Sequence, residues 1–487
     1  MNRRSPHSPR PPRLPHSPHS PRALPVRLLA ALPVIAVALS ACSALRTPEV
    51  DPALDVPQHW QHAPRQDTAG QPGTALEQHA WWEAFGDPQL SALVASALAT
   101  NNDLAITALR FERARLRAGL AATNRAPELS AQARGTRQWS LDGPGRRDEG
   151  GLNATVNYEI DLWGRLASLR GAAHWEARAS AADLEAATIA LAATTATLYW
   201  RAGLLNELID ISGQSLADAR RTLGLVAARY RAGAVSGLDL AQAEQQLAAL
   251  LAERTVLDQQ RSENRQALAI LFNRPPGHDV AEPQALPVEA LPRIAAGIPA
   301  AVVGRRPDVR QAEWRLRAAL ANADATRASF YPKLTLTGIV GTGSAALASL
   351  LRDPTALLGA GLSLPFLQWN TTQLTIQVSH NEYQETVVQY RQSLYTAFAE
   401  VENALSDHAG LGVRADRLGE SLESASRAER LSAARYRAGA TALQPWLDAK
   451  ETLRQAAVAA ARNRFDRLVN ITTLYKALGG PAVESGA

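Results

Sequence analysis

The chain repeats itself, and this duplication constrains its fold more than any other feature. The heptapeptide Ala228–Ala234, with the sequence ARYRAGA, returns unchanged at Ala434–Ala440, an offset of 206 residues. The same offset aligns Trp163 with Trp369, and an offset of 205 continues the alignment upstream. The sequence therefore predicts two copies of one unit of roughly 200 residues, which together make up nearly all of the mature protein.

Long stretches without proline indicate where helices form. Proline is absent from residues 89–126, 145–274, 308–331 and 366–444, and helix interiors exclude proline. In the second stretch apolar residues recur every seven positions with one eleven-residue step, a period typical of a coiled-coil seam. The seam consists of Leu184, Leu191, Leu198, Leu205, Leu216, Leu223 and Tyr230. A continuous helix over residues 165–232 would extend for roughly 100 Å at 1.5 Å per residue.

Shorter segments with a two-residue period predict strands. Apolar residues alternate over 129–135 and 152–160 in the first copy, and over 334–340 and 358–364 in the second. Each strand has about ten residues, the length that a tilted strand needs to cross a bilayer. A soluble hairpin with one face in water would show the same alternation, so the pattern alone leaves both interpretations open.

The first 41 residues are typical of an export signal that ends at a lipidation site. An arginine-rich start precedes the apolar run Leu28–Leu39, which at about 12 residues is too short to span a bilayer. The run leads into Leu39-Ser-Ala-Cys42, which resembles a bacterial lipobox and contains the only cysteine of the chain. We expect Cys42 to be the lipidated first residue of the mature protein; the alternative is a buried free thiol.

Charge and motifs exclude several classes of function. The formal net charge is +5, but residues 1–41 hold six arginines and no acid, which leaves 51 − 6 = 45 basic against 46 acidic residues. A near-neutral mature chain has no electrostatic basis for binding nucleic acid. The sequence lacks a phosphate-binding glycine loop and a Gly-x-Ser-x-Gly element, and His59 and His62 lack a nearby third ligand. We therefore expect no enzyme activity, no metal and no cofactor.

Four strands per chain have a further consequence if they lie in lipid. Four strands cannot close a barrel, and an open strand edge is not tolerated in a bilayer, so several chains must pool their strands. A dimer would supply eight strands and a trimer twelve. Periodicity does not choose between these two assemblies.

Several motifs between Trp81 and Pro481 occur in a combination that is highly specific. They are Trp81-Trp82-x-x-Phe85-x-Asp87-Pro-x-Leu90, Asn102-x-Leu104, Arg305-Arg-Pro-Asp308, Tyr331-Pro-x-Leu334 and the duplicated Arg-Tyr-Arg-Ala-Gly. Together they resemble the TolC-like outer membrane factors, in the NodT-type lipoprotein branch of efflux channels. The resemblance implies a mixed, mostly α fold that assembles as a homotrimer, with a 12-stranded outer-membrane β-barrel continued by a 12-helix periplasmic tunnel.

The same resemblance implies a function and its partners. The chain would be the channel component of a tripartite efflux or export system in the outer membrane of a Gram-negative bacterium. It would be a passive conduit, opened by contact with a periplasmic adaptor and an inner-membrane pump, often of the resistance-nodulation-division class. The alternative is a lipid-anchored periplasmic coiled-coil adaptor without a membrane barrel.

Two short links between long helices correspond, by resemblance, to the periplasmic entrance. Gly233 and Gly439 can adopt left-handed backbone angles that end one helix before the next begins, and we expect these tips to contact the adaptor. Asp239 and Tyr436 match family positions that tie neighbouring hairpins shut. Asp448 matches a ring of carboxylates in the throat.

Two further residues, Arg437 and Gln444, complete the predicted gate. Gln444 and Pro445 stand where the family pattern often has an apolar residue and an acid, so we expect a more polar constriction and a displaced helix start. The alternative is that Asp239 only caps the following helix and that Asp448 faces solvent.

These patterns divide the chain into six segments. We predict, in order, a signal peptide, a lipid-anchored linker, a first repeat with a strand pair near 128–160, an inter-repeat linker, a second repeat with a strand pair near 333–366, and a tail. Their bounds are 1–41, 42–74, 75–280, 281–304, 305–481 and 482–487.

Overall fold

The computed structural model describes residues 46–63, 80–139, 141–143, 145–287, 291–292, 299–344 and 354–479. The predicted signal peptide, Cys42 and the C-terminal tail lie outside the described residues. Met1–Pro48 and Glu49–Ala487 form two separate units, and everything below concerns the second.

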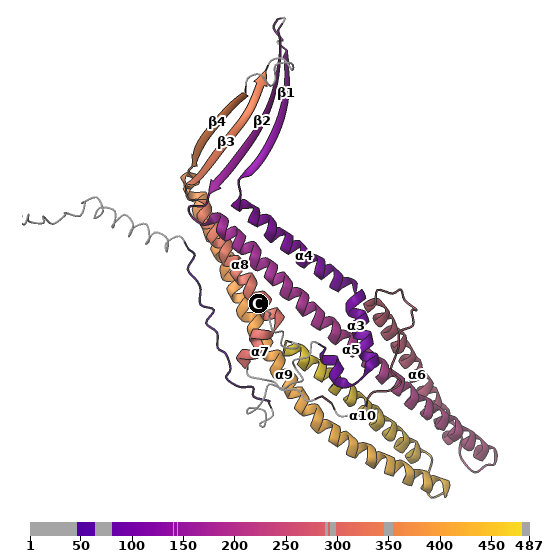
Figure 1. The fold of residues 1–487 in the computed structure, drawn as a ribbon. Coiled ribbons are helices and arrows are strands. Elements are labelled where there is room, and N and C mark those ends of the chain that lie inside the picture. Colours follow the sequence, from indigo (N-terminus) through magenta and orange to yellow (C-terminus); the bar gives the residue numbers. More distant parts are fainter. Residues whose placement is uncertain are drawn as a thin grey trace, which may run out of the picture. The chain divides into compact units, whose positions relative to one another are not determined.

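The two copies have the same order of α-helices and strands and differ only in their short 3-10 helices (η), which confirms the predicted duplication (Figure 1). The first copy contains η1 (Trp81–Phe85), α3 (Pro88–Thr100), α4 (Asn102–Ala122), η2 (Thr123–Arg125), β1 (Glu128–Trp139), β2 (Arg146–Ile160), α5 (Arg165–Arg231) and α6 (Gly237–Leu271). The second contains α7 (Pro299–Arg305), α8 (Pro307–Ser329), β3 (Lys333–Ser344), β4 (Pro354–Ser363), η4 (Pro365–Leu367), α9 (Trp369–Arg437) and α10 (Gln444–Ala477).

The long helices form where proline is absent, as predicted. α5 and α9 have 67 and 69 residues. The first proline-free stretch is divided at Asn101 into α3 and α4. The Asn101 side chain accepts a hydrogen bond from the backbone N–H of Leu104 (3.0 Å) and so caps α4. None of the described helices is by itself long and apolar enough to span a membrane; α3 and α4 with η2 meet the criterion only as a pair bent by 49°.

The predicted coiled-coil seam of α5 ends earlier than expected. Leu191, Leu205 and Leu216 are buried, in agreement with the prediction. Tyr230, which was assigned to the same seam, is 46% exposed, so this part of the prediction is wrong. A seven-residue period indicates which positions share one face of a helix, but a partner helix must also cover that face.

The four strands form one antiparallel sheet in the order β1-β2-β3-β4, and β2 and β3 join the two copies. The register sets apolar residues opposite one another across the sheet: Leu129 faces Val156, Val156 faces Gly338, and Gly338 faces Leu358. One face is therefore apolar from the helix end of the sheet to Leu152, whereas Thr342 and the Arg137–Asp148 pair follow on it at the far end. This face is uncovered in the chain, since Leu358 is 93% exposed. The other face is mostly polar, with Ile339 and Leu357 as apolar members. Its polar residues include Gln132, Arg134, Asn153, Thr155, Asn157, Thr335 and Thr337.

Residues 49–63, called the strap below, follow α9 without forming a helix or strand. The backbone N–H of Val50 donates to the Tyr383 hydroxyl (3.0 Å), and Trp60 is buried against Phe398. The segment belongs to the predicted lipid-anchored linker, residues 42–74. It is extended, but it shares the core of the second copy.

His62 of the strap contacts α9, because its Nδ1 lies 2.5 Å from the carboxylate oxygen Oε1 of Glu402. Among the described residues no group of three or more potential ligands could hold a metal ion. The backbone N–H groups of Gln61 and His62 also donate to the Glu402 carboxylate, at 3.2 and 2.9 Å, and so attach the strap to α9.

Candidate functional site: the tips of the helical hairpins

The two links that join α5 to α6 and α9 to α10 have the same backbone geometry. Gly233 and Gly439 adopt φ angles of 70° and 73°, as their sequence context predicted. The N–H after each glycine donates to the carbonyl five residues earlier, from Ala234 to Arg229 and from Ala440 to Arg435, both at 2.9 Å. The N–H of each glycine donates to the carbonyl three residues earlier, from Gly233 to Tyr230 at 2.9 Å and from Gly439 to Tyr436 at 3.0 Å. These two bonds in each link, with the left-handed glycine, define a Schellman motif, which ends a helix by satisfying its last carbonyls.

Asp239 caps α6 in the described chain. The Ser236 hydroxyl accepts a hydrogen bond from the Asp239 N–H (3.3 Å), and the Asp239 carboxylate accepts one from the Ser236 N–H (2.9 Å). This reciprocal pair is a capping box. None of the hydrogen bonds of Asp239 within the described residues reaches Tyr436.

Tyr436 lies between the two hairpins, and it is only 3% exposed. Its ring stacks on Trp446 of α10, with centroids 5.1 Å apart, and the guanidinium of Arg229 on α5 lies 5.0 Å from it. The Tyr436 hydroxyl is buried and has no hydrogen-bond partner among the described residues. Arg437 extends this cluster, with its guanidinium 5.8 Å from the Trp446 ring.

Asp448 is exposed on the first turns of α10, where its carboxylate accepts a hydrogen bond from the Gln444 amide (2.7 Å). The starts of the two second helices differ by one residue between the copies. α10 begins at Gln444, one residue after the position equivalent to Gly237, which begins α6 (237 + 206 = 443). Ala442 and Pro445 replace the two members of the capping box in this copy.

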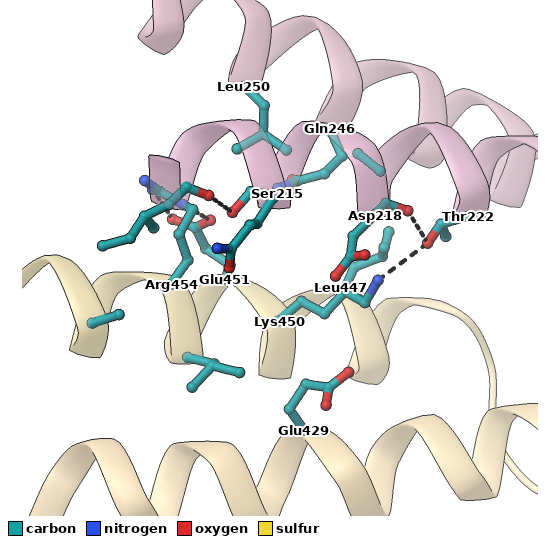
Figure 2. A pocket seen from close by; sticks show the side chains of 15 residues that line it. Ser215, Asp218, Thr222, Gln246, Leu250, Glu429, Leu447, Lys450, Glu451 and Arg454 are labelled. Atoms are coloured by element: carbon teal, nitrogen blue, oxygen red, sulfur yellow. Dashed lines mark hydrogen bonds and ion pairs between the residues drawn. The ribbon is translucent and has the colours of Figure 1, made fainter. Parts of the chain in front are cut away.

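A cavity of about 330 Å³ lies behind the tips, between α5, α6, α9 and α10 (Figure 2). Lys450 enters it from α10; its ammonium lies 4.5 Å from the Trp446 ring and donates to the Thr222 hydroxyl on α5 (3.3 Å). Burial lowers the pKa of Lys450, because the charged form loses water, and attraction by Asp218 and Glu429 offsets this only in part.

No sequence pattern singled out Lys450, since its partners are distant in the chain. Its contact with Thr222 and the Arg229–Tyr436 contact are links between the two hairpins near their tips. The hairpins also share a buried apolar cluster, in which Val226 and Ala243 of the first pack with Tyr436 and Trp446 of the second, and Arg454 of α10 pairs with Glu253 of α6 at 2.7 Å.

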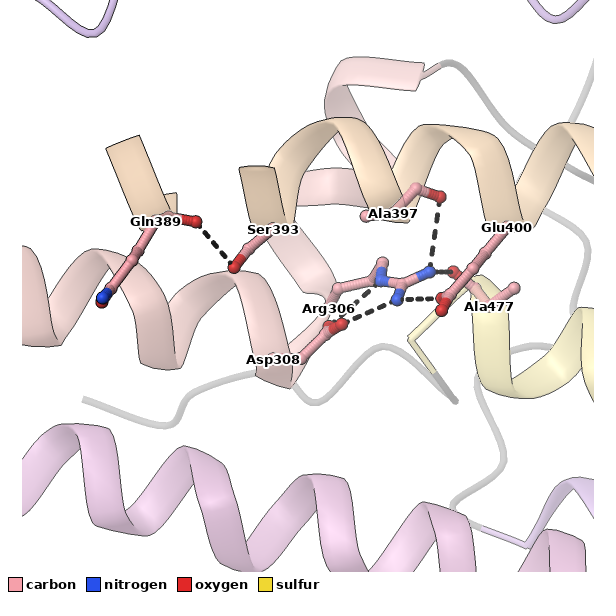
Figure 3. Close-up of polar contacts among 7 residues, drawn as sticks. All are labelled: Arg306, Asp308, Gln389, Ser393, Ala397, Glu400 and Ala477. Carbon is pink, nitrogen blue, oxygen red and sulfur yellow. Dashed lines mark hydrogen bonds and ion pairs between the residues drawn. The ribbon is translucent and has the colours of Figure 1, made fainter. Parts of the chain in front are cut away.

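A second polar cluster fixes the opposite end of α10 (Figure 3). The buried guanidinium of Arg306 donates to the carboxylates of Asp308 (2.7 Å) and Glu400 (2.5 Å) and to the Ala477 carbonyl (2.9 Å). Burial alone would raise the pKa of Asp308, but the hydrogen bonds and charge of Arg306 outweigh it, and the pKa lies below its usual value. This cluster gives the Arg305-Arg-Pro-Asp308 motif a structural role.

Comparison with known proteins identifies the class. The family described as "Outer membrane efflux protein" matches residues 93–274 and 299–480, one segment in each copy. These segments make up more than half of the chain, which therefore belongs to this family of TolC-like outer membrane factors. It is an outer-membrane channel component for efflux or export, and the family is one of transport channels. The predicted family, fold class and function are thereby confirmed, and the adaptor alternative is set aside.

Individual relatives agree with this assignment. The chain is 33% identical to the pyoverdine export outer membrane protein OpmQ of Pseudomonas putida over 465 residues, covering 93% of this chain and 97% of the relative. It is 31% identical to the outer membrane protein OprJ of Pseudomonas aeruginosa, covering 92% and 94%. The crystal structure of the open state of the MtrE outer membrane channel of Neisseria gonorrhoeae superposes with a TM-score of 0.75 at 31% identity, covering 90% of this chain and 98% of that one.

Proposed function

We propose that three copies of the chain close into one channel, with a 12-stranded barrel in the outer membrane and a helical tunnel in the periplasm. The observation that carries this proposal is the pair of free sheet edges: among the described strands, β1 pairs only with β2, and β4 only with β3. In lipid these edges must pair with another chain. The apolar face of the sheet then meets lipid, and the polar face lines the lumen.

The helices that flank the sheet support the same closure. α4 precedes β1 and α9 follows β4, so each helix lies on the side of one free edge. Each exposes a stripe of large apolar side chains at helical spacing; these are Leu109, Leu116 and Leu120 on α4, and Leu374, Val378 and Val388 on α9. Packing α4 of one copy against α9 of the next would bury both stripes.

The two ends of the strands also fit a bilayer. Exposed tryptophans lie at the far end of β1, at Trp139, and at the helix end of the sheet, at Trp163 and Trp369. Tryptophan concentrates at membrane interfaces in transmembrane barrels. We propose in addition that Cys42 carries a lipid and that the strap leads from this anchor to α9.

The hairpin tips form the proposed periplasmic gate. Three copies of the exposed Asp448 around one axis would repel anions and attract cations. Tyr436, whose hydroxyl lacks a partner within the described chain, could donate to a carboxylate of a neighbouring hairpin after its ring turns outward. Arg437, Gln444 and Asp239 belong to the same gate in this proposal.

The proposed partners are a periplasmic adaptor, which would contact the tips at Gly233 and Gly439, and an inner-membrane pump of the resistance-nodulation-division class. Support comes from the position of both glycines at the turns farthest along the chain from the strands. Contact at these turns would act on the links between the hairpins.

Native mass measurement in detergent tests the assembly. We expect three chains for the unmodified protein, and dissociation for Leu116→Arg, which sets a charge in the apolar stripe of α4. Leu141→Arg, at an exposed residue beyond the end of β1, is the matched control and should remain trimeric. A stable monomer with folded strands would contradict the proposal.

Planar bilayer recordings test the gate. Tyr436→Phe combined with Asp239→Ala should raise single-channel conductance, whereas the control Tyr230→Phe should not. Asp448→Asn should reduce cation preference without a change in assembly. If conductance and selectivity both match the unmodified trimer, the constriction lies elsewhere.

A further inference from the structure

A groove rich in arginine lies between α4, α5 and α8, away from the hairpin tips. Arg110, Arg113 and Arg117 project from one face of α4 at spacings of three, four and seven residues, and they line a groove of about 530 Å³ with α5 and α8. Arg315 of α8 lines its far wall. The acids that line the groove are Glu176 and Asp183.

The arginines of α4 lack internal compensation. Asp183 is already engaged, since it accepts hydrogen bonds from Arg315 (2.9 Å) and Gln311. Among the described residues, no carboxylate lies within ion-pair distance of the three α4 arginines. Four arginines against two acids leave a local charge of 4 − 2 = +2 in each copy.

The position of the strap indicates which side of the helices the groove faces. Val50 of the strap packs in a cluster with Leu316 and Leu320 of α8. Leu320 is five residues from Arg315, or about 140° around the helix, so the strap and the groove lie on different sides of α8. A strap that continues from a lipid anchor must run outside the tunnel, and the groove then faces the interior.

We propose that this groove is a transit site for anionic cargo, recognised through its carboxylate groups. The proposal rests on the trimeric channel described above. A guanidinium is always charged and its fork matches the two oxygens of a carboxylate. Three such grooves on the inner wall would raise the local anion concentration. Because the α4 arginines are solvent-exposed, each contact is brief, as passage through a channel requires.

Selectivity measurements test the groove. In planar bilayers with a potassium citrate gradient, Arg110→Gln, Arg113→Gln and Arg117→Gln together should shift the citrate-to-potassium permeability ratio towards potassium by about two-fold or more. Arg115→Gln is the matched control, because Arg115 lies on the same helix but is paired with Glu112 at 2.7 Å; it should leave the ratio unchanged. Glu176→Gln removes the uncommitted acid of the groove and should shift the ratio towards citrate.

Two results would overturn the proposal. One is an unchanged ratio for both the triple variant and Glu176→Gln in intact trimers. The other is loss of the trimer in the triple variant together with no effect of Glu176→Gln. In that case the arginines would contact the exposed Glu382 and Glu385 on α9 of the next copy. A monomeric or non-conducting unmodified protein would instead contradict the channel assembly itself.

Discussion

The two hairpin tips share one heptapeptide and one turn, yet their tyrosines occupy opposite environments. Tyr230 is 46% exposed and Tyr436 is 3% exposed. The difference arises at the equivalent positions Leu240 and Trp446 (240 + 206 = 446). The indole of Trp446 stacks on Tyr436, and α5 of the first hairpin covers the second. Duplicated sequence therefore reproduces the backbone, whereas burial depends on which copy packs on which.

The largest expected effect is the difference in stability between alanine variants of the two tyrosines. Tyr436→Ala should destabilise its tip by about 3 kcal/mol, because it leaves a cavity beside Trp446, whereas Tyr230→Ala should cost less than about 1 kcal/mol. Hydrogen–deuterium exchange of the amides of residues 434–450 should accelerate about 100-fold in the first variant. Equal effects of the two variants would show that the buried cluster does not hold the second tip.

A smaller effect is expected at the helix ends remote from the tips. Asn101 donates to the Leu271 carbonyl (3.1 Å) and Arg306 to the Ala477 carbonyl (2.9 Å), at equivalent positions of the two copies. Arg306→Ala should lower the free energy of unfolding by about 1.5–3 kcal/mol, because charge-assisted bonds are lost, and Asn101→Ala by about 1 kcal/mol. Urea unfolding in detergent measures both. A larger loss for Asn101→Ala would contradict this ranking.

The Arg306 cluster also predicts a pH dependence confined to the second copy. Because the folded-state pKa of Asp308 is lowered, its contribution to stability is present above the unfolded value of about 3.9 and is lost as the pH falls through the folded value. Asp308→Asn should therefore lower the thermal midpoint at pH 7 and have little effect once the pH is below the folded-state pKa of Asp308. Its side chain is 49% exposed, so we expect a shift of a few degrees.

Substitution of either link glycine by alanine should lower the stability by the same amount. Both adopt a left-handed angle, so Gly233→Ala and Gly439→Ala should each cost about 1–2 kcal/mol. The thermal midpoints of the two variants should agree closely. A clear difference between them would mean that the covered tip compensates for backbone strain in a way that the exposed tip cannot.

The smallest expected effects on stability concern the first residues of α6 and α10. Ser236→Ala should cost about 1 kcal/mol, because it removes the capping box. The reverse change, Ala442→Ser, should bring no gain, since Pro445 has no N–H to donate. Stabilisation by Ala442→Ser in thermal unfolding would contradict this account.

Much of the fold was predictable because it follows from local patterns. Missing prolines marked the long helices, alternation marked the strands, and Gly233 and Gly439 marked the turns. The break at Asn101 was missed, because one polar residue in a helical stretch is a weak signal until its cap is formed. The role of Lys450 was missed for another reason: Thr222, which its ammonium contacts, is 228 residues away in the chain.

In the candidate gate, too, some features followed from local sequence and others did not. The turns at the tips followed from the glycine links, whereas the displacement of the start of α10 from the family pattern stays a prediction. The capping role of Asp239 was one of two open alternatives, and the described chain contains it. The burial of Tyr436 could not be predicted, because Tyr230, the equivalent residue of the first copy, has the same flanking residues and remains exposed.

By itself, the sequence determined the duplicated order of elements, the ends of the helices at glycine and proline, and the apolar and polar faces of the strands. These properties depend on backbone angles, hydrogen bonds and side-chain period within a few residues. Only the tertiary structure decided which tyrosine is buried, where the strap lies and which arginines have partners. Such features depend on contacts between segments far apart in the chain, and identical local sequences cannot distinguish them.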